Sequence, residues 1–308
     1  MNFRTFTEQF LQKRRVLVLS KEISPSTFHS DCIRLEKLTP AFASYRIDAI
    51  SSLHVDRFLD FLILNGKSPA TRNRYRALLH TIFKYSIRMG VCTLNPVAEI
   101  PILSERVKVR RVDYWKSEHE IDAYIEHAYH YREVFGVGAA ILCLGGCRIS
   151  ELLALKWGDV EWDMGYIRIR RIVERHTNTI HERTKGQKSG GEYQMLMFPR
   201  LRELLTDWMK RTPFKRDEDF IIRDVKGAHL SYDVYHKHHN RIIARAGLKR
   251  ITLHDLRRTF ASAAERAGFH KAEIGELLGH ETLSATEAYT RVDVGHLLDK
   301  GKRVRFGT

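Results

Sequence analysis

The sequence predicts a mostly α-helical protein with a small antiparallel β-sheet. Apolar residues recur at helical spacing through most of the first hundred residues, behind the capping pairs Ser24-Pro25 and Ser68-Pro69. Strand-like alternation is confined to residues 166–198, around the glycine-rich run KGQKSGG. Helical periodicity then returns. This order predicts helices on both sides of one short run of strands.

A charged stretch divides the chain into two predicted domains. Residues 104–112 read SERVKVRRV, which is too polar for a core, and they follow Asn95-Pro96 and Pro101, which interrupt the helical pattern. We therefore expect a helical domain over residues 1–103, a basic linker over 104–112 and a second domain over 113–308.

Two further helices are expected in the first domain. The apolar stretch 53–64 is closed by Asn65-Gly66, and residues 71–89 form the fourth helix of the domain. That helix carries basic residues around an apolar stripe. Most such residues lie on solvated faces, but together they indicate an anionic partner. The ones we take as contacts are Arg72, Arg74, Arg76 and Lys84.

The second domain opens with a predicted helix that starts at Ser117, where Ser-x-x-Glu makes a capping box with Glu120. Residues 134–144 are apolar nearly all round, which indicates a buried helix, and Gly145-Gly146 ends it.

Arg148 is expected in the first turn of the next helix, with Glu151 one turn later on the same face. Arginine and glutamate at this spacing usually form only a surface ion pair. Exposed amides at a helix start, however, also favour a phosphate.

Strands are predicted over 166–173, 180–185 and 193–198, and helices over 199–211 and 232–246. The last helix contains HKHH at 236–239. His236 and His239 have the spacing for one metal ion, but no carboxylate or cysteine flanks them to complete the shell. We therefore favour a basic, DNA-facing surface over a metal site.

The stretch 251–291 brings polar residues onto short helices. Thr252 can cap a helix from residue 253 on which His254 and Arg257 share one face. Leu256, Phe260 and Ala264 recur on the opposite face and are expected in the core.

Gly268 is expected to end that helix. A short helix over 271–278 stops at Gly279, directly before His280. A second capping box, Ser284 with Glu287, then opens a helix that carries Tyr289.

Composition favours a protein that binds nucleic acid. The 308 residues are 43% hydrophobic with a formal net charge of +15, which favours an anionic polymer as partner. Residues 1–108 hold 17 Lys and Arg against nine Asp and Glu, and the remainder holds 35 against 28. Both predicted domains are therefore expected to touch the same partner.

Other classes are disfavoured. The four cysteines lack the spacing of a zinc site, and with no cleavable signal sequence we expect them to be reduced and intracellular. Cys143 and Cys147 are expected to be packing residues. The longest apolar run, 137–144, is too short for a membrane helix.

The motifs HDLR, LLGH and AYTRV at 254–257, 277–280 and 288–292 resemble the C-terminal signature of the tyrosine recombinases, or phage integrases. Roughly a hundred residues upstream, GGCRISELLALKW is similar to the family's Thr-Gly-x-Arg-x-x-Glu-Leu box. Gly145 stands where that box has threonine. The resemblance covers nearly the whole chain and implies an N-terminal core-binding domain and a C-terminal catalytic domain.

The resemblance implies a catalytic set of Arg148, Lys185, His254, Arg257, His280 and Tyr289, with Glu151 holding Arg148. In the family, tyrosine attacks the phosphodiester and remains bound to the 3′ phosphate, and a hairpin lysine assists. Lys185 is our choice for that lysine, and Lys188 is the rival. Neither a metal ion nor another cofactor is implied.

The resemblance further implies double-stranded DNA with an inverted-repeat site as partner, and a homotetramer on two duplexes. Arg110 and Arg258 are added to the DNA contacts expected on the fourth helix. We expect the protein in the cytoplasm, on the nucleoid, and without the arm-binding domain of larger phage integrases. The alternatives are a type IB topoisomerase, which does not pair two sites, and a DNA-binding regulator that does not cleave.

Overall fold

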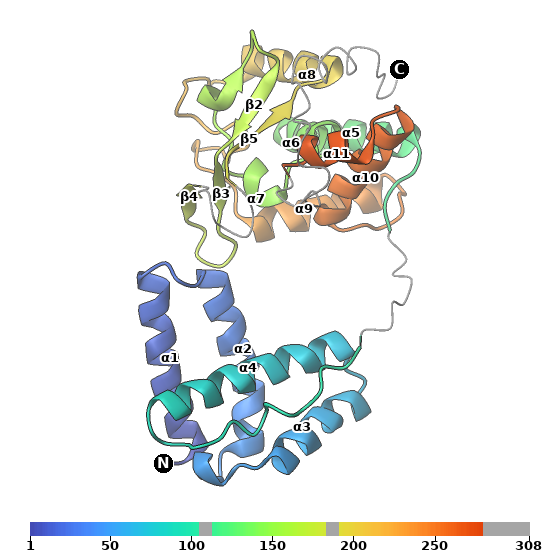
Figure 1. Ribbon diagram of the computed structural model, residues 1–308. Coiled ribbons are helices and arrows are strands. Elements are labelled where there is room, and N and C mark those ends of the chain that lie inside the picture. Colours follow the sequence, from blue (N-terminus) through green and yellow to red (C-terminus); the bar gives the residue numbers. More distant parts are fainter. Residues whose placement is uncertain (105–112, 183–190, 280–308) are drawn as a thin grey trace. The chain divides into compact units, whose positions relative to one another are not determined.

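The computed structural model describes residues 1–104, 113–182 and 191–279. The chain divides into two compact units, Met1–Arg110 and Arg111–Thr308. The predicted fold class, mostly helical with a little antiparallel sheet, is confirmed (Figure 1). The predicted linker lies almost entirely outside the described residues and stays a prediction.

The first unit is a bundle of four helices, α1 (Phe3–Leu19), α2 (Pro25–Phe42), α3 (Ser52–Leu64) and α4 (Pro69–Arg88), with a 3-10 turn at Ile47–Ala49. The predicted caps are present, because the Ser24 and Ser68 hydroxyls accept from amides three residues on, at 3.1 and 3.2 Å. Its core is largely aromatic and branched, and includes Phe3, Phe6, Leu38, Leu59, Leu79, Ile82 and Phe83.

Two of the arginines predicted to contact DNA on α4 instead face their own unit. Arg72 is only 2% exposed, and its Nη1 donates to the carbonyl of Pro101 at 2.6 Å. Arg76 is half-buried, and its Nε donates to the carbonyl of Ile100 at 2.6 Å. Residues 97–103 pass over α4 in irregular backbone, so the carbonyls of Ile100 and Pro101 lack the regular partners of a helix or strand and accept from arginine side chains of α4. The prediction is wrong for Arg72, and the Arg76 guanidinium is turned inward, whereas Arg74 and Lys84 are exposed.

The core of the second unit is built on α6 (Glu133–Gly145), in which every residue from Phe135 to Gly145 is buried. The predicted buried helix is therefore confirmed. The helix before it, α5 (Glu118–Tyr131), begins with the predicted capping box, since the Ser117 hydroxyl accepts from the Glu120 amide at 3.2 Å. Gly146 ends α6 in the left-handed region (φ 72°), where a Cβ would lie 2.4 Å from the Phe260 ring.

The strands form two small sheets. In the first, β1 (Val160–Glu161), β2 (Tyr166–Ile169) and β5 (Tyr193–Leu196) pair antiparallel in that order. The second pairs β3 (Arg171–Val173) with β4 (Ile180–Glu182). Strand β1 was not predicted.

The prediction of one continuous strand over 166–173 is wrong, because the chain breaks at Arg170. The buried carboxylate of Asp159 accepts from Arg170 Nε at 2.7 Å and also from the Arg171 guanidinium. Two consecutive side chains of a regular strand point to opposite faces, so both can reach one carboxylate only where the strand is interrupted.

The remaining helices match the predicted ranges to within a residue or two: α8 (Pro199–Arg211), α9 (Tyr232–Arg245), α10 (Leu253–Arg266) and α11 (Lys271–Leu277). Gly268, the predicted end of α10, follows the C-cap residue Ala267 with a φ of 88°. Leu256, Phe260 and Ala264 are buried as expected. Within the described residues no helix is long and apolar enough to cross a membrane.

One member of the histidine cluster on α9 belongs to the core, so the predicted DNA-facing surface is wrong for His239, whereas Lys237 is exposed. His239 is 1% exposed, and its Nδ1 lies 2.6 Å from the Tyr124 hydroxyl while Nε2 lies 3.0 Å from the Ile251 carbonyl. A neutral ring that donates from Nε2 and accepts at Nδ1 satisfies both contacts. His238 packs on the Phe135 ring at 4.5 Å. Helical spacing alone does not show which side of α9 the core covers.

Because His239 is buried, we expect acid to lower the stability of the folded protein. Desolvation lowers the pKa of His239 to about 4, so between pH 6.5 and 4 the unfolded chain binds a proton that the folded chain does not. The contribution of neutral His239 to the free energy of unfolding is therefore fully present above about pH 6.5 and is lost as the pH falls through 4. A shift of this size is worth about 3 kcal/mol of unfolding free energy.

Urea titrations followed by tryptophan fluorescence measure this, because all four tryptophans lie in the second unit. We expect wild type to lose about 3 kcal/mol more than His239→Gln between pH 7 and pH 4. The control is His119→Gln on α5, an exposed histidine that should keep the wild-type pH dependence. Equal pH slopes for wild type and His239→Gln would contradict the assignment.

Candidate active site

Arg148 lies at the start of α7 (Ile149–Leu152), as its N-cap residue and not in its first turn as predicted. Its backbone amide donates to Glu151 Oε2 at 2.7 Å and its Nη1 donates to Glu151 Oε1 at 2.9 Å. The Glu151 side chain is 1% exposed, whereas that of Arg148 is 31% exposed. The predicted pair is therefore present, with the carboxylate buried and the guanidinium open to a ligand.

Arg257 joins the ends of two helices. It is 4% exposed on α10, and its Nη1 donates to the Gly146 carbonyl at 2.9 Å while Nη2 donates to the Leu278 carbonyl. These carbonyls lie at the C-terminal ends of α6 and α11, where helical carbonyls lack partners. Gly146 is two residues before Arg148, and Leu278 is two residues before His280. Arg257 thus holds together the chain segments that lead into two predicted catalytic residues.

His254 lies on the first turn of α10, whose predicted cap is present, since the Thr252 hydroxyl accepts from the Asp255 amide at 3.3 Å. Partial desolvation lowers the pKa of His254, and the charges of Arg258, Arg257 and Arg148 lower it further. His254 is accordingly neutral near pH 7 and able to accept a proton. The hydrogen bond from Arg257 on α10 to the Gly146 carbonyl, two residues before Arg148, brings α10 close to the start of α7.

Tyr193 belongs to this site, although it was not among the predicted residues. Its hydroxyl donates to Glu151 Oε2 at 2.9 Å, from a position 42 residues along the chain on β5. Its ring lies against Gly279, where a Cβ would be 2.5 Å from the ring. Burial, followed by the Glu151 charge, raises the pKa of Tyr193 well above its usual value, so the hydroxyl stays protonated. Nothing in the spacing of the motifs points to this tyrosine.

Packing also accounts for the departure from the family box at Gly145. A Cβ on Gly145 would lie 2.6 Å from Met195 Sδ on β5. The methionine therefore fills space beside α6 that a threonine side chain at 145 would enter.

The predicted residues Lys185, His280, Tyr289 and Arg110 lie outside the described residues, as does the Ser284–Glu287 capping box. Arg258 is described, and it makes an ion pair with Asp255 at 2.9 Å. Its side chain is 35% exposed, so the DNA contact stays a prediction.

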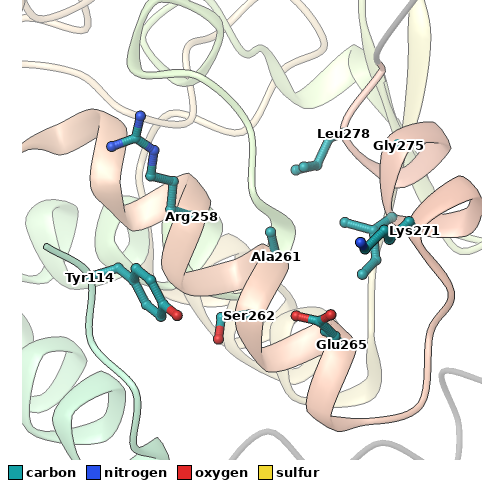
Figure 2. A pocket seen from close by; sticks show the side chains of 9 residues that line it. Tyr114, Arg258, Ala261, Ser262, Glu265, Lys271, Gly275 and Leu278 are labelled. Carbon is teal, nitrogen blue, oxygen red and sulfur yellow. The ribbon is translucent and has the colours of Figure 1, made fainter. Parts of the chain in front are cut away.

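A cavity of about 390 Å³ adjoins Arg258 between α10 and α11. Figure 2 shows Tyr114, Ser262 and Glu265 along its α10 side, with Lys271 and Leu278 contributed by the α11 side. It is a surface beside the arginine site and contains none of the predicted catalytic residues.

The described residues of this site suit the binding of an anion. Among them no group of three or more His, Cys, Asp or Glu side chains is placed to hold a metal ion. Cys143 and Cys147 are buried and unbonded, as expected of packing residues. Two guanidinium groups and one neutral imidazole can instead bind and polarise a phosphate.

The chain is similar in sequence to two tyrosine recombinases. Over 277 residues the chain is 28% identical to tyrosine recombinase XerC of Thermodesulfovibrio yellowstonii, which covers 84% of this chain and 83% of that protein. It is 26% identical over 265 residues to tyrosine recombinase XerD of Listeria innocua, with 83% of each covered.

Solved structures show the same fold. A lambda integrase dimer bound to a COC′ core site superposes with a TM-score of 0.68 at 18% identity, covering 95% of this chain and 99% of that one. The Tn1549 transposon integrase in complex with transposon right end DNA gives a TM-score of 0.72 at 17% identity, covering 99% of both chains.

The family model described as "Phage integrase family" matches residues 117–296, which is more than half of the chain and contains every predicted catalytic position. The chain therefore belongs to the phage integrase family, the tyrosine recombinases.

Proposed function

We propose that this protein is a site-specific DNA recombinase that cleaves and rejoins DNA strands through a covalent bond between Tyr289 and a 3′ phosphate. The observation that carries the proposal is the pair of fixed guanidinium groups, Arg148 held by buried Glu151 and Arg257 held by two helix ends. Rigid donors of this kind stabilise charge that develops on phosphate oxygens in the transition state without reorganising.

The proposed reaction is an exchange of one phosphate ester for another. The Tyr289 oxygen attacks phosphorus, the bond from phosphorus to the 5′ oxygen breaks, and Lys185 donates a proton to that leaving oxygen. His254, neutral near pH 7, is expected to accept the proton that the Tyr289 hydroxyl loses on attack, and His280 is expected to donate a hydrogen bond to the phosphate. The new ester conserves the energy of the broken strand, so a 5′ hydroxyl can reverse the step on the same or another strand.

A nicked DNA substrate tests the proposal directly. After cleavage the short strand with the 5′ hydroxyl dissociates, rejoining is prevented, and the protein–DNA adduct accumulates. On duplexes from the inverted repeats beside its own gene, we expect adduct on denaturing gels even in excess EDTA, because arginines supply the positive charge. Strict dependence on a divalent cation, or cleavage without adduct, would exclude this mechanism.

We further propose that the active assembly is a homotetramer on two duplexes, acting on cytoplasmic, nucleoid DNA. One solved relative is a lambda integrase tetramer bound to a Holliday junction. The tail after Tyr289 contains Val292, Val294, Leu297 and Leu298, more apolar residues than a free tail requires, followed by the basic run KGKRVRF. These residues lie outside the described ones. We expect the tail to dock on a neighbouring protomer.

Deletion of residues 294–308 should separate assembly from binding. We expect pairing of two sites, measured as a two-duplex complex on native gels, to fall much more than binding to a single site. A type IB topoisomerase does not pair sites, so the same deletion would leave its activity unchanged. Unchanged recombination by the truncated chain would refute the docking role.

A further inference from the structure

We propose that Tyr193 is a positioning residue for DNA cleavage: it holds Glu151, and through it Arg148, against the turn that precedes His280. This inference rests on the proposed function and names a residue outside the motifs that identify the family. Tyr193 does not itself reach the reacting atoms; it acts on the groups that do.

The first support is the hydrogen bond to Glu151. Glu151 is buried, and its Oε2 accepts from both the Tyr193 hydroxyl at 2.9 Å and the Arg148 amide at 2.7 Å. Its Oε1 then receives the Arg148 guanidinium at 2.9 Å. Hydrogen bonds from two different groups fix the orientation of the Glu151 carboxylate. The Arg148 guanidinium, which is bound to the other carboxylate oxygen, is therefore fixed as well.

The second support is the contact between the ring and Gly279. Because a Cβ at Gly279 would lie 2.5 Å from the ring, the turn passes directly over the face of Tyr193. Gly279 has a φ of 61°, which glycine adopts without strain, and it is the residue before His280. One aromatic ring therefore separates the carboxylate that orients Arg148 from the backbone that leads to His280.

The third support is the location of Tyr193 in the chain. It begins β5, whose four residues all pair with β2, so its backbone is fixed by the sheet. It also follows the glycine-rich segment that carries Lys185. The sheet thus fixes the backbone of Tyr193, and its side chain contacts both Glu151 and Gly279.

The test is Tyr193→Phe, which removes one oxygen and keeps the ring against Gly279. On the nicked substrate at saturating DNA, we expect adduct formation to slow by about 10- to 100-fold, the effect of losing a hydrogen bond to a charged group. The DNA concentration for half-saturation should not change. Tyr166→Phe is the matched control, since Tyr166 lies on the adjacent strand β2 and no hydrogen bond of its hydroxyl is found among the described residues; it should cleave at the wild-type rate.

A double-mutant cycle separates positioning from packing. Leucine at position 151 fills similar space but accepts no hydrogen bond. In the Glu151→Leu background, adding Tyr193→Phe should therefore slow adduct formation by less than about threefold. Equal losses in both backgrounds, or a wild-type rate for Tyr193→Phe alone, would overturn the proposal. A chain with p-aminophenylalanine at position 193 keeps both the ring and a hydrogen-bond donor, so it should cleave at nearly the wild-type rate. Slow cleavage by this chain would also overturn the proposal. This test does not depend on whether Tyr193→Phe folds. Absence of adduct with the wild-type chain would instead count against the proposed function itself.

Discussion

The Tyr289→Phe variant is expected to bind the recombination site with wild-type affinity and to form no covalent adduct at all. The substitution removes a single oxygen, and that oxygen is the proposed nucleophile. Phenylalanine keeps the ring, so packing and the positive surface that holds DNA should be retained. The variant should therefore lose all adduct formation and keep its full affinity for DNA.

Two measurements on the same nicked duplex decide this result. A native gel gives the affinity, and a denaturing gel gives the covalent fraction. Tyr232→Phe is a suitable control, because Tyr232 lies on α9, stacks on His236 and belongs to none of the family motifs. An adduct that survives Tyr289→Phe would assign the nucleophile to another residue.

Replacing Lys185 with alanine is expected to slow cleavage by about 10²- to 10⁴-fold, the usual cost of removing a general acid. The departing 5′ oxygen is a poor leaving group unless it receives a proton. An ammonium with an ordinary pKa near 10 can provide one while staying charged at neutral pH. In sequence Lys185 comes soon after β4, which ends at Glu182, whereas Lys188 comes later in a glycine-flanked segment, so we expect Lys185 to be the better-held donor.

Sulfur in place of the bridging 5′ oxygen identifies which lysine donates the proton. A thiolate leaves without protonation, so this substrate should restore most of the rate to Lys185→Ala. Lys188→Ala is the matched control and should cleave both substrates at nearly the wild-type rate. Rescue of Lys188→Ala, with Lys185→Ala remaining slow, would exchange the two assignments. Rescue of neither would place the general acid elsewhere.

The amino-acid sequence by itself determined the helices, most of their ends and the family. Helix ends depend on residues only three or four positions apart, so the local sequence predicts them. Examples are the caps Ser68 and Ser117 and the left-handed glycines at 66, 146 and 279. The pairing of Arg148 with Glu151 was predictable for the same reason, since the two residues are three apart. The catalytic positions were identified by motif resemblance, which does not depend on knowing which side chains meet.

Tertiary structure alone decided what each polar side chain does. Arg257 reaches a carbonyl 111 residues away, Tyr193 reaches a carboxylate 42 residues away, and His239 meets a tyrosine 115 residues away. Arg72 was predicted to contact DNA and is instead buried against Pro101. Periodicity shows that a residue lies on a helix and which neighbours share its face. It does not show which face another segment covers, and that covering determines whether an arginine binds a phosphate or a carbonyl, and whether a histidine is charged or neutral.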